Sequence, residues 1–186
     1  NPERTMVVVD PRRTETAKKA DIFLQVKPGK DAFLMAALLG VIFQEDLIDK
    51  EFINTQTVGF EEIKPHFMSI PIAEYAEIAG ISWEQIQQVA RGMDTAKTMA
   101  IRSDLGLEQS HNSTLNSYLV RLLFLVTGNF GKEGTNCLHT AFLPLIGHSK
   151  SPEEGGPVTP VTGMQGIAKL FPPNIIPQEI DTDHPD

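Results

Sequence analysis

The chain has 186 residues, enough for one domain with a short appendage, and its hydrophobic and charged fractions are ordinary for a globular protein. A net charge of −8 and the lack of any lysine- or arginine-rich block argue against a nucleic-acid partner. The single cysteine, Cys137, excludes an internal disulfide and an iron–sulfur cluster held by this chain alone. The histidines show no spacing typical of a metal site.

Two further features concern location and completeness. The longest apolar run, Ala32 to Phe43, is too short to cross a bilayer, so we expect no membrane span. No signal peptide precedes the first strand, so we expect a cytoplasmic location, with an export signal upstream in the parent protein as the open alternative. The chain begins without Met, just before an apolar strand, and ends in a polar segment that contains proline. We therefore expect it to be a piece of a longer protein.

Two strand-like segments open the chain. Residues 5–9 read as a buried strand and residues 12–20 as a short helix. A second apolar strand covers residues 22–26 and is closed by Lys27-Pro28-Gly29. Asp31 stands where an N-cap belongs, before a helix that is apolar nearly all round and should be buried.

Helices dominate the middle of the chain. Ser82 and Gln85 have the spacing of a capping box, which predicts a helix that runs to about Met93. The other predicted elements are short helices at about 49–55, 59–67 and 72–79, a third strand at 98–102, a loop at 105–109, and an amphipathic helix at 112–127 that Gly128 ends.

Strands that alternate with helices predict an α/β domain with a parallel, Rossmann-like, doubly wound sheet over residues 1–134. The character changes after that. Seven of the 13 prolines follow residue 150, and residues 135–186 read as a mostly irregular, Pro/Gly-rich extension.

Polar clusters follow each of the three predicted strands, where open parallel sheets bind their ligands. The candidate binding residues at these strand ends are Asp10, Arg12 and Thr14, then Gly29, Lys30 and Asp31, then Gly106 and Gln109.

Each cluster suits part of a nucleotide-like ligand. Asp10 can accept hydrogen bonds from ribose hydroxyls, and the guanidinium forks of Arg12 and Arg13 suit phosphate. Gly29 permits close approach of the backbone. The Asp31 carboxylate matches the adjacent N1–H and amino donors of guanine, and Gln109 suits a pterin or a phosphate oxygen. No G-x-G-x-x-G or P-loop motif supports an ordinary NAD or ATP site.

From the residues alone, plainer interpretations stay open. Asp10 and Pro11 form a turn whether or not a ligand is bound. The role of an N-cap is a sufficient explanation of Asp31, and that role can coexist with ligand binding. Gln109 is equally well a surface loop residue without a ligand.

The ordered series V-V-D-P-R-x-T-E-T-A-x-x-A-D-I-x-L-x-x-K-P-G-x-D at 8–31 resembles the central region of molybdopterin oxidoreductases of the dimethyl-sulfoxide-reductase and formate-dehydrogenase type. The resemblance continues in L-G-x-x-Q at 105–109 and in L-V-T-G-N-F-G-K-E-G at 125–134. It is dense over residues 5–134 and weaker beyond them.

The resemblance implies an α/β domain that holds one guanine-dinucleotide half of a molybdopterin cofactor, with molybdenum or tungsten, in a longer enzyme. Asp10, Arg12 and Thr14 would contact the nucleotide. Asp31, next to Gly29 and Lys30, would pair with guanine. Gly106 and Gln109 would reach the pterin. The implied partners are a cluster-binding domain, a C-terminal barrel domain and a small-molecule substrate.

The chain also departs from the family. No upstream cysteine cluster motif and no Cys, selenocysteine, Ser or Asp ligand to the metal matches it, so we expect no catalytic residue and no metal ligand here. Leu105 stands where many relatives have Met. We expect the chain alone to lack both turnover and the cofactor. Two rivals remain: a structural domain of an electron-transfer complex that has lost the cofactor, and the central domain of a thiamine-diphosphate enzyme.

Overall fold

The computed structural model describes residues 4–137, 158–165, 171 and 175–180. The chain divides into two compact units, Asn1–Leu138 and His139–Asp186, and each is considered by itself.

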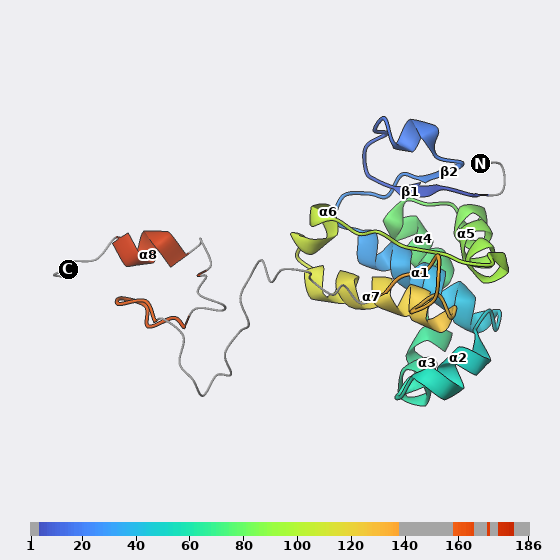
Figure 1. Ribbon diagram of the computed structural model, residues 1–186. Helices are drawn as coiled ribbons and strands as arrows, with labels where there is room; N and C mark the ends of the chain where they lie inside the picture. The colour runs from blue at the N-terminus through green and yellow to red at the C-terminus, as the bar shows by residue number, and fades with distance from the viewer. Residues whose placement is uncertain (1–3, 138–157, 166–170, 172–174, 181–186) are drawn as a thin grey trace. The chain divides into compact units, whose positions relative to one another are not determined.

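A small parallel sheet opens the first unit (Figure 1). Strand β1 (Val7–Val9) pairs with β2 (Ile22–Leu24), and Val9 lies opposite Leu24 in the register. A 3-10 turn, η1 (Ala17–Lys19), lies on the crossover between them, so the predicted helix over 12–20 is reduced to this turn. β1 is also less buried than predicted, because Val7 and Val9 are 37% and 44% exposed.

Helices make up most of the rest of the first unit. Their bounds are α1 (Asp31–Gln44), α2 (Lys50–Gln56), α3 (Phe60–Met68), α4 (Ile72–Ala79), α5 (Trp83–Thr95), α6 (Leu105–Glu108) and α7 (Ser113–Val126). The unit is therefore mixed α/β with a two-stranded sheet. The predicted α/β class is confirmed in this coarse sense, whereas a doubly wound Rossmann-like sheet is not.

The predicted third strand at 98–102 is wrong within the described residues. Its backbone finds no strand partner. Instead, the N–H groups of Met99 and Ile101 donate to the side-chain oxygens of Asn129 and Asn136, at 2.8 Å each. The segment therefore has its hydrogen bonds satisfied by side chains, which β-propensity alone does not reveal.

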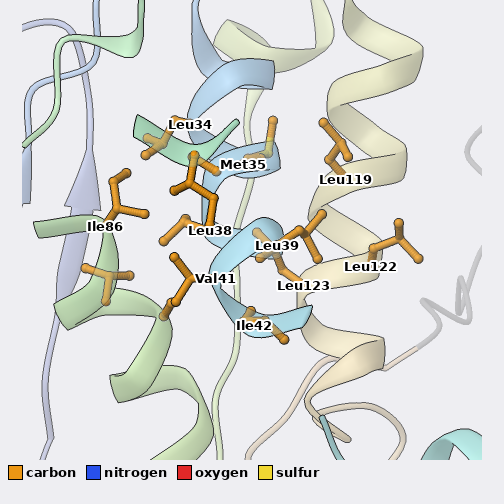
Figure 2. Close-up of a cluster of buried hydrophobic side chains, with 14 of the residues drawn as sticks. Leu34, Met35, Leu38, Leu39, Val41, Ile42, Ile86, Leu119, Leu122 and Leu123 are labelled. Atoms are coloured by element: carbon orange, nitrogen blue, oxygen red, sulfur yellow. The ribbon is translucent and has the colours of Figure 1, made fainter. Parts of the chain in front are cut away.

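Helix α1 is the centre of the core, as its apolar sequence predicts. It contacts α3, α4, α5 and α7. Figure 2 shows its side chains between Ile86 of α5 and the leucines 119, 122 and 123 of α7. Leu39 is fully buried, and burial of such a side chain contributes about 1.5–3 kcal/mol. Gly40 lets α4 approach closely, since a Cβ there would lie 2.8 Å from Cγ1 of Ile72.

Local signals fix several helix ends. The capping box of α5 is confirmed: Ser82 Oγ accepts from the Gln85 N–H at 3.2 Å, and Gln85 Oε1 accepts from the Ser82 N–H at 3.4 Å. Helix α7 ends before Gly128, as predicted, with Gly128 at φ +65°. A Cβ at Gly128 would lie 2.0 Å from Oδ2 of Asp49, the residue that caps α2.

The second unit is described only in part. Glu179 of α8 (Ile176–Ile180) accepts hydrogen bonds from the backbone N–H and the hydroxyl of Thr162, at 2.9 and 2.6 Å. The Thr162 hydroxyl is the first cause that lowers the pKa of Glu179, to about 2. Part of the predicted extension is thus ordered, while residues 138–157 lie outside the described part of the chain.

Candidate functional site

The carboxyl ends of β1 and β2 lie side by side, because the two strands are parallel and in register. Two contacts continue the pairing beyond the strands. The Asp10 N–H donates to the carbonyl of Leu24 at 3.3 Å, and Gln25 Nε2 donates to the carbonyl of Pro11 at 3.1 Å. The first predicted cluster thus begins at the edge where both strands end, next to the segment that leads from β2 to the second cluster.

The first cluster is a tight turn. Asp10 Oδ1 accepts from the backbone N–H of Arg12 at 2.7 Å, and the Thr14 N–H donates to the Arg12 carbonyl at 2.9 Å. Thr14 Oγ1 accepts from the Ala17 N–H at 3.2 Å and so holds the start of η1. The turn interpretation of Asp10 is therefore confirmed, and it leaves Asp10 Oδ2 for another donor.

The two arginines of this turn differ. Arg13 lies with its guanidinium 5.7 Å from the centre of the Phe23 ring, a cation–π arrangement. Arg12 is exposed, and no carboxylate in the described residues pairs with it. Arg12 therefore has neither an ion pair nor an aromatic contact among the described residues, whereas the guanidinium of Arg13 has the contact with Phe23.

The second cluster surrounds the start of α1. Gly29 has φ +72°, and a Cβ there would meet no atom within 4 Å, so the backbone is open on this side. Lys30, not Asp31, is the N-cap residue, and it forms no side-chain cap. The predicted capping role of Asp31 is wrong, because Asp31 is already the first residue of the helix. Its carboxylate therefore does not make the hydrogen bond of an N-cap residue to the next turn.

Asp31 is half-buried, and that burial is the main cause that raises the pKa of its carboxyl group. A hydrogen bond from its own backbone N–H opposes the rise. In the described part of the chain, no lysine or arginine pairs with it. A partly desolvated carboxylate without a cationic partner can accept hydrogen bonds from a ligand, and two adjacent N–H groups of a base are one such set of donors.

The third cluster is a one-turn helix, where a loop was predicted. Asp104 begins α6 by accepting from the Leu105 N–H at 2.9 Å, and Gln109 ends it by donating its N–H to the Leu105 carbonyl at 2.9 Å. The Leu105 N–H is the first cause that lowers the pKa of Asp104, followed by Arg102. Gly106 and Gln109 are both exposed.

The eight predicted binding residues therefore belong to more than one local group in the structure. The first cluster lies at the edge where β1 and β2 end, and the second lies further along the chain from the end of β2, at the start of α1. No hydrogen bond or ion pair within the described residues joins Gly106 or Gln109 to Asp10 or Asp31. Convergence of all three clusters on one ligand remains a prediction.

One hollow of about 300 Å³ lies elsewhere, at the turn between α2 and α3. Ile53, Thr57 and Phe60 are among its lining residues, and none of the predicted site residues is. It is open to solvent, and its wall brings together no group of catalytic type beyond Glu61 and Glu62. We do not assign it to the site.

Residues that the sequence did not single out support α6. Asn116 is buried, and its Nδ2 donates to Ser110 Oγ at 2.8 Å. Its Oδ1 has no partner among the described residues, a situation that costs roughly 1–3 kcal/mol. Asn136 bonds both backbone groups of Ile101. A buried asparagine within a leucine-rich helix was the one available signal, and it is a weak one.

Comparison with known proteins adds an independent finding. The chain is 38% identical over 130 residues to the "F420-dependent formate dehydrogenase subunit alpha" of Methanocaldococcus jannaschii, a match that covers 70% of the chain and 19% of that protein. It is 35% identical over 135 residues to "Nitrate reductase" of Synechocystis, covering 73% of the chain and 19% of that protein. It is 35% identical over 144 residues to "Formate dehydrogenase H" of Escherichia coli, a match that covers 77% of the chain and 19% of that protein.

A solved structure agrees. "Acetylene Hydratase from Pelobacter acetylenicus" superposes with a TM-score of 0.67 and 33% identity, over 70% of this chain and 18% of that chain. No family profile matches the chain.

These relatives are all molybdopterin oxidoreductases, and the chain belongs to that family. It spans about a fifth of the length of the relatives that it matches. Among the described residues, no helix combines the length and apolarity needed to cross a membrane, and no three side chains of His, Cys, Asp or Glu are grouped to hold a metal ion.

Proposed function

We propose that the chain is part of a molybdopterin-dependent oxidoreductase of the formate-dehydrogenase type and binds the guanine dinucleotide part of its cofactor. The observation that carries the proposal is Asp31, a half-buried carboxylate at the start of α1 with a raised pKa and no cationic partner among the described residues. The identity to two formate dehydrogenases supports the reaction class.

Each residue has a proposed role. Asp31 accepts the two adjacent N–H groups of guanine, and the open backbone at Gly29 with Lys30 lets the base approach. Arg12 binds phosphate, while Asp10 and Thr14 shape the turn that presents it.

The pterin side of the ligand is assigned to α6. Gly106 offers backbone without a side chain there, and Gln109 offers an amide. Both are exposed on one short helix, which Asp104 begins.

The residues fit this group because they include an uncapped helix start, a guanidinium without an ion pair and a carboxylate without a cationic partner among the described residues. In the loaded enzyme, the metal–pterin group supplies two-electron chemistry, and this chain binds and orients it. We assign no catalytic residue and no metal ligand to the chain. Molybdenum or tungsten, a small-molecule substrate, further domains of the parent enzyme and a cytoplasmic location complete the proposal.

One relative limits how far the reaction is defined. The structure with a TM-score of 0.67 is named as a hydratase, and so is "Acetylene hydratase" of Syntrophotalea acetylenica, 33% identical over 154 residues. The same domain thus serves enzymes with differently named reactions. We therefore rest the proposal on cofactor binding first and on dehydrogenase activity second.

The test is a titration of the chain with GDP, read by NMR so that millimolar affinities are detected. Asp31→Ala should weaken GDP binding by about 10-fold or more, since hydrogen bonds to a charged group contribute about 1.5–3 kcal/mol. Asp94→Ala, an exposed aspartate near the end of α5, is the matched control and should change nothing. Equal affinity of the wild type and Asp31→Ala would remove the guanine contact.

A further inference from the structure

We infer that Asn116 and Asn136 are positioning residues that hold the α6 loop, residues 102–109, from its two ends. What the loop contacts rests on the proposed function. The anchoring itself follows from the hydrogen bonds of the described residues.

The front anchor, Asn136, makes the hydrogen bonds that a neighbouring strand would make. Asn136 Oδ1 accepts from the Ile101 N–H and Asn136 Nδ2 donates to the Ile101 carbonyl, both at 2.8 Å. These are the two backbone groups that a neighbouring strand would bond. Asn129 supplies a similar acceptor to the Met99 N–H. The segment that enters the α6 loop is therefore held in place by side-chain amides where no strand pairs with it.

The rear anchor lies in α7. Asn116 is 1% exposed, and its Nδ2 donates to Ser110 Oγ at 2.8 Å. The Ser110 hydroxyl in turn donates to the Leu107 carbonyl at 2.9 Å, inside the loop. Asn116 Nδ2 also donates to the Leu107 carbonyl at 3.5 Å, so this amide holds the loop both through Ser110 and directly, while its Oδ1 has no partner in the described residues.

The stretch between the anchors is open. The side chains of Arg102 and Asp104 are 88% and 70% exposed, Leu105 is 59% exposed, and a Cβ at Gly106 would meet nothing within 4 Å. Leu107 packs against the core and α6 contacts α7, which hold the segment between its ends as well. A segment that is fixed in this way and otherwise exposed is preorganised to present its backbone and Gln109 to a ligand. If the asparagines served only the stability of the fold, their loss would loosen the whole unit alike.

The pH dependence of the Asn136→Asp variant distinguishes a local positioning role from a general role in stability. An ionised carboxylate accepts from the Ile101 N–H but cannot donate to the Ile101 carbonyl, whereas a protonated carboxyl group does both. Amide exchange protection of residues 101–110 should fall several-fold near pH 7 and recover near pH 4, while protection in α1 stays constant. The wild type and Asn54→Asp, an exposed control on α2, should show no such recovery. Equal loss in α1, or no loss in the loop, would overturn the inference.

A ligand arm tests the role in binding. NMR titrations use tetrahydrobiopterin, a reduced pterin, and separately GDP, with Asn116→Leu compared with the wild type. The pterin affinity should fall several-fold while the GDP affinity is unchanged. Equal weakening of both ligands would contradict a local role. No pterin binding by the wild type would also overturn the positioning role, while the guanine contact of Asp31, which GDP tests, would stand.

Discussion

Asp10 Oδ1 accepts a hydrogen bond from the backbone N–H of Arg12 at 2.7 Å, directly beyond the end of β1. The contact fixes the backbone of Arg12 without using its guanidinium, because the Asp10 side chain bonds the backbone alone. A carboxylate and a free guanidinium are thereby held two residues apart at the edge where β2 also ends. The turn at residues 10–14 is thus the first part of the candidate site.

Arg12→Ala should weaken GDP binding by about tenfold and leave guanosine binding unchanged, because only GDP carries phosphate. Arg13→Ala is the matched neighbour. Its guanidinium lies against Phe23, so its loss should affect GDP binding less than the loss of Arg12. Titrations of both variants with both ligands measure the difference. An equal effect on guanosine would show that Arg12 does not act through phosphate.

Asp31→Asn should raise the thermal midpoint at pH 7. Because burial raises the pKa of Asp31, the folded state binds the proton more tightly than the unfolded state does. The free energy of unfolding therefore falls as pH rises from the usual aspartate range through the folded pKa. The gain from Asn should be present at pH 7 and vanish near pH 3, where both side chains are neutral.

Asp104→Asn is a control for which we expect the opposite change in the thermal midpoint. The Leu105 N–H lowers the pKa of Asp104, so ionised Asp104 stabilises the fold above the usual aspartate range, and this stabilisation is lost as pH falls through the folded pKa. Asp104→Asn should lower the midpoint at pH 7, and the loss should shrink in acid. The same sign for both variants would contradict the assignment of these environments.

Gly128→Ala should destabilise the chain more than Gly131→Ala. Both glycines have a positive φ, +65° and +73°, which costs a residue with a Cβ about 1–2 kcal/mol. Only Gly128 is crowded, because its Cβ would lie 2.0 Å from Oδ2 of Asp49 and would displace the cap of α2, worth about 1 kcal/mol more. Denaturant unfolding of both variants measures the difference, and equal losses would contradict it.

Leu39→Ala should lower the free energy of unfolding by about 2–5 kcal/mol, because Leu39 is fully buried at the centre of α1. Val58→Ala is the control, since Val58 is 99% exposed, and its change should stay within about 0.5 kcal/mol. Similar effects of the two substitutions would mean that α1 is not the core of the unit.

The elements that the sequence predicted well are those with complete local signals. The buried α1 follows from an unbroken apolar run, and the start of α5 follows from Ser82 and Gln85. Gly128 marks the end of α7 for the same reason, since a positive φ suits glycine.

The wrong predictions fall where residues that are distant in sequence determine the local structure. The segment at 98–102 has strand-like residues, but Asn129 and Asn136, about 30 residues later, take the place of a strand. Asp31 resembled an N-cap, and its own position within the first turn of α1 prevents that. Of the three predicted strand ends, the sequence indicated those of β1 and β2, whereas the third cluster follows no strand. The anchors of α6 depended on contacts that no local pattern encodes.

The central claim is that the turn at Asp10 and the start of α1 bind one guanine nucleotide together. Two-dimensional NMR of the chain titrated with GDP tests it most directly, because each backbone amide reports separately. We predict that the amide signals of residues 10–14 and 29–32 shift along one common binding curve, and that Asp31→Ala abolishes both sets of shifts. Shifts confined to the hollow between α2 and α3, or separate curves for the two segments, would contradict it.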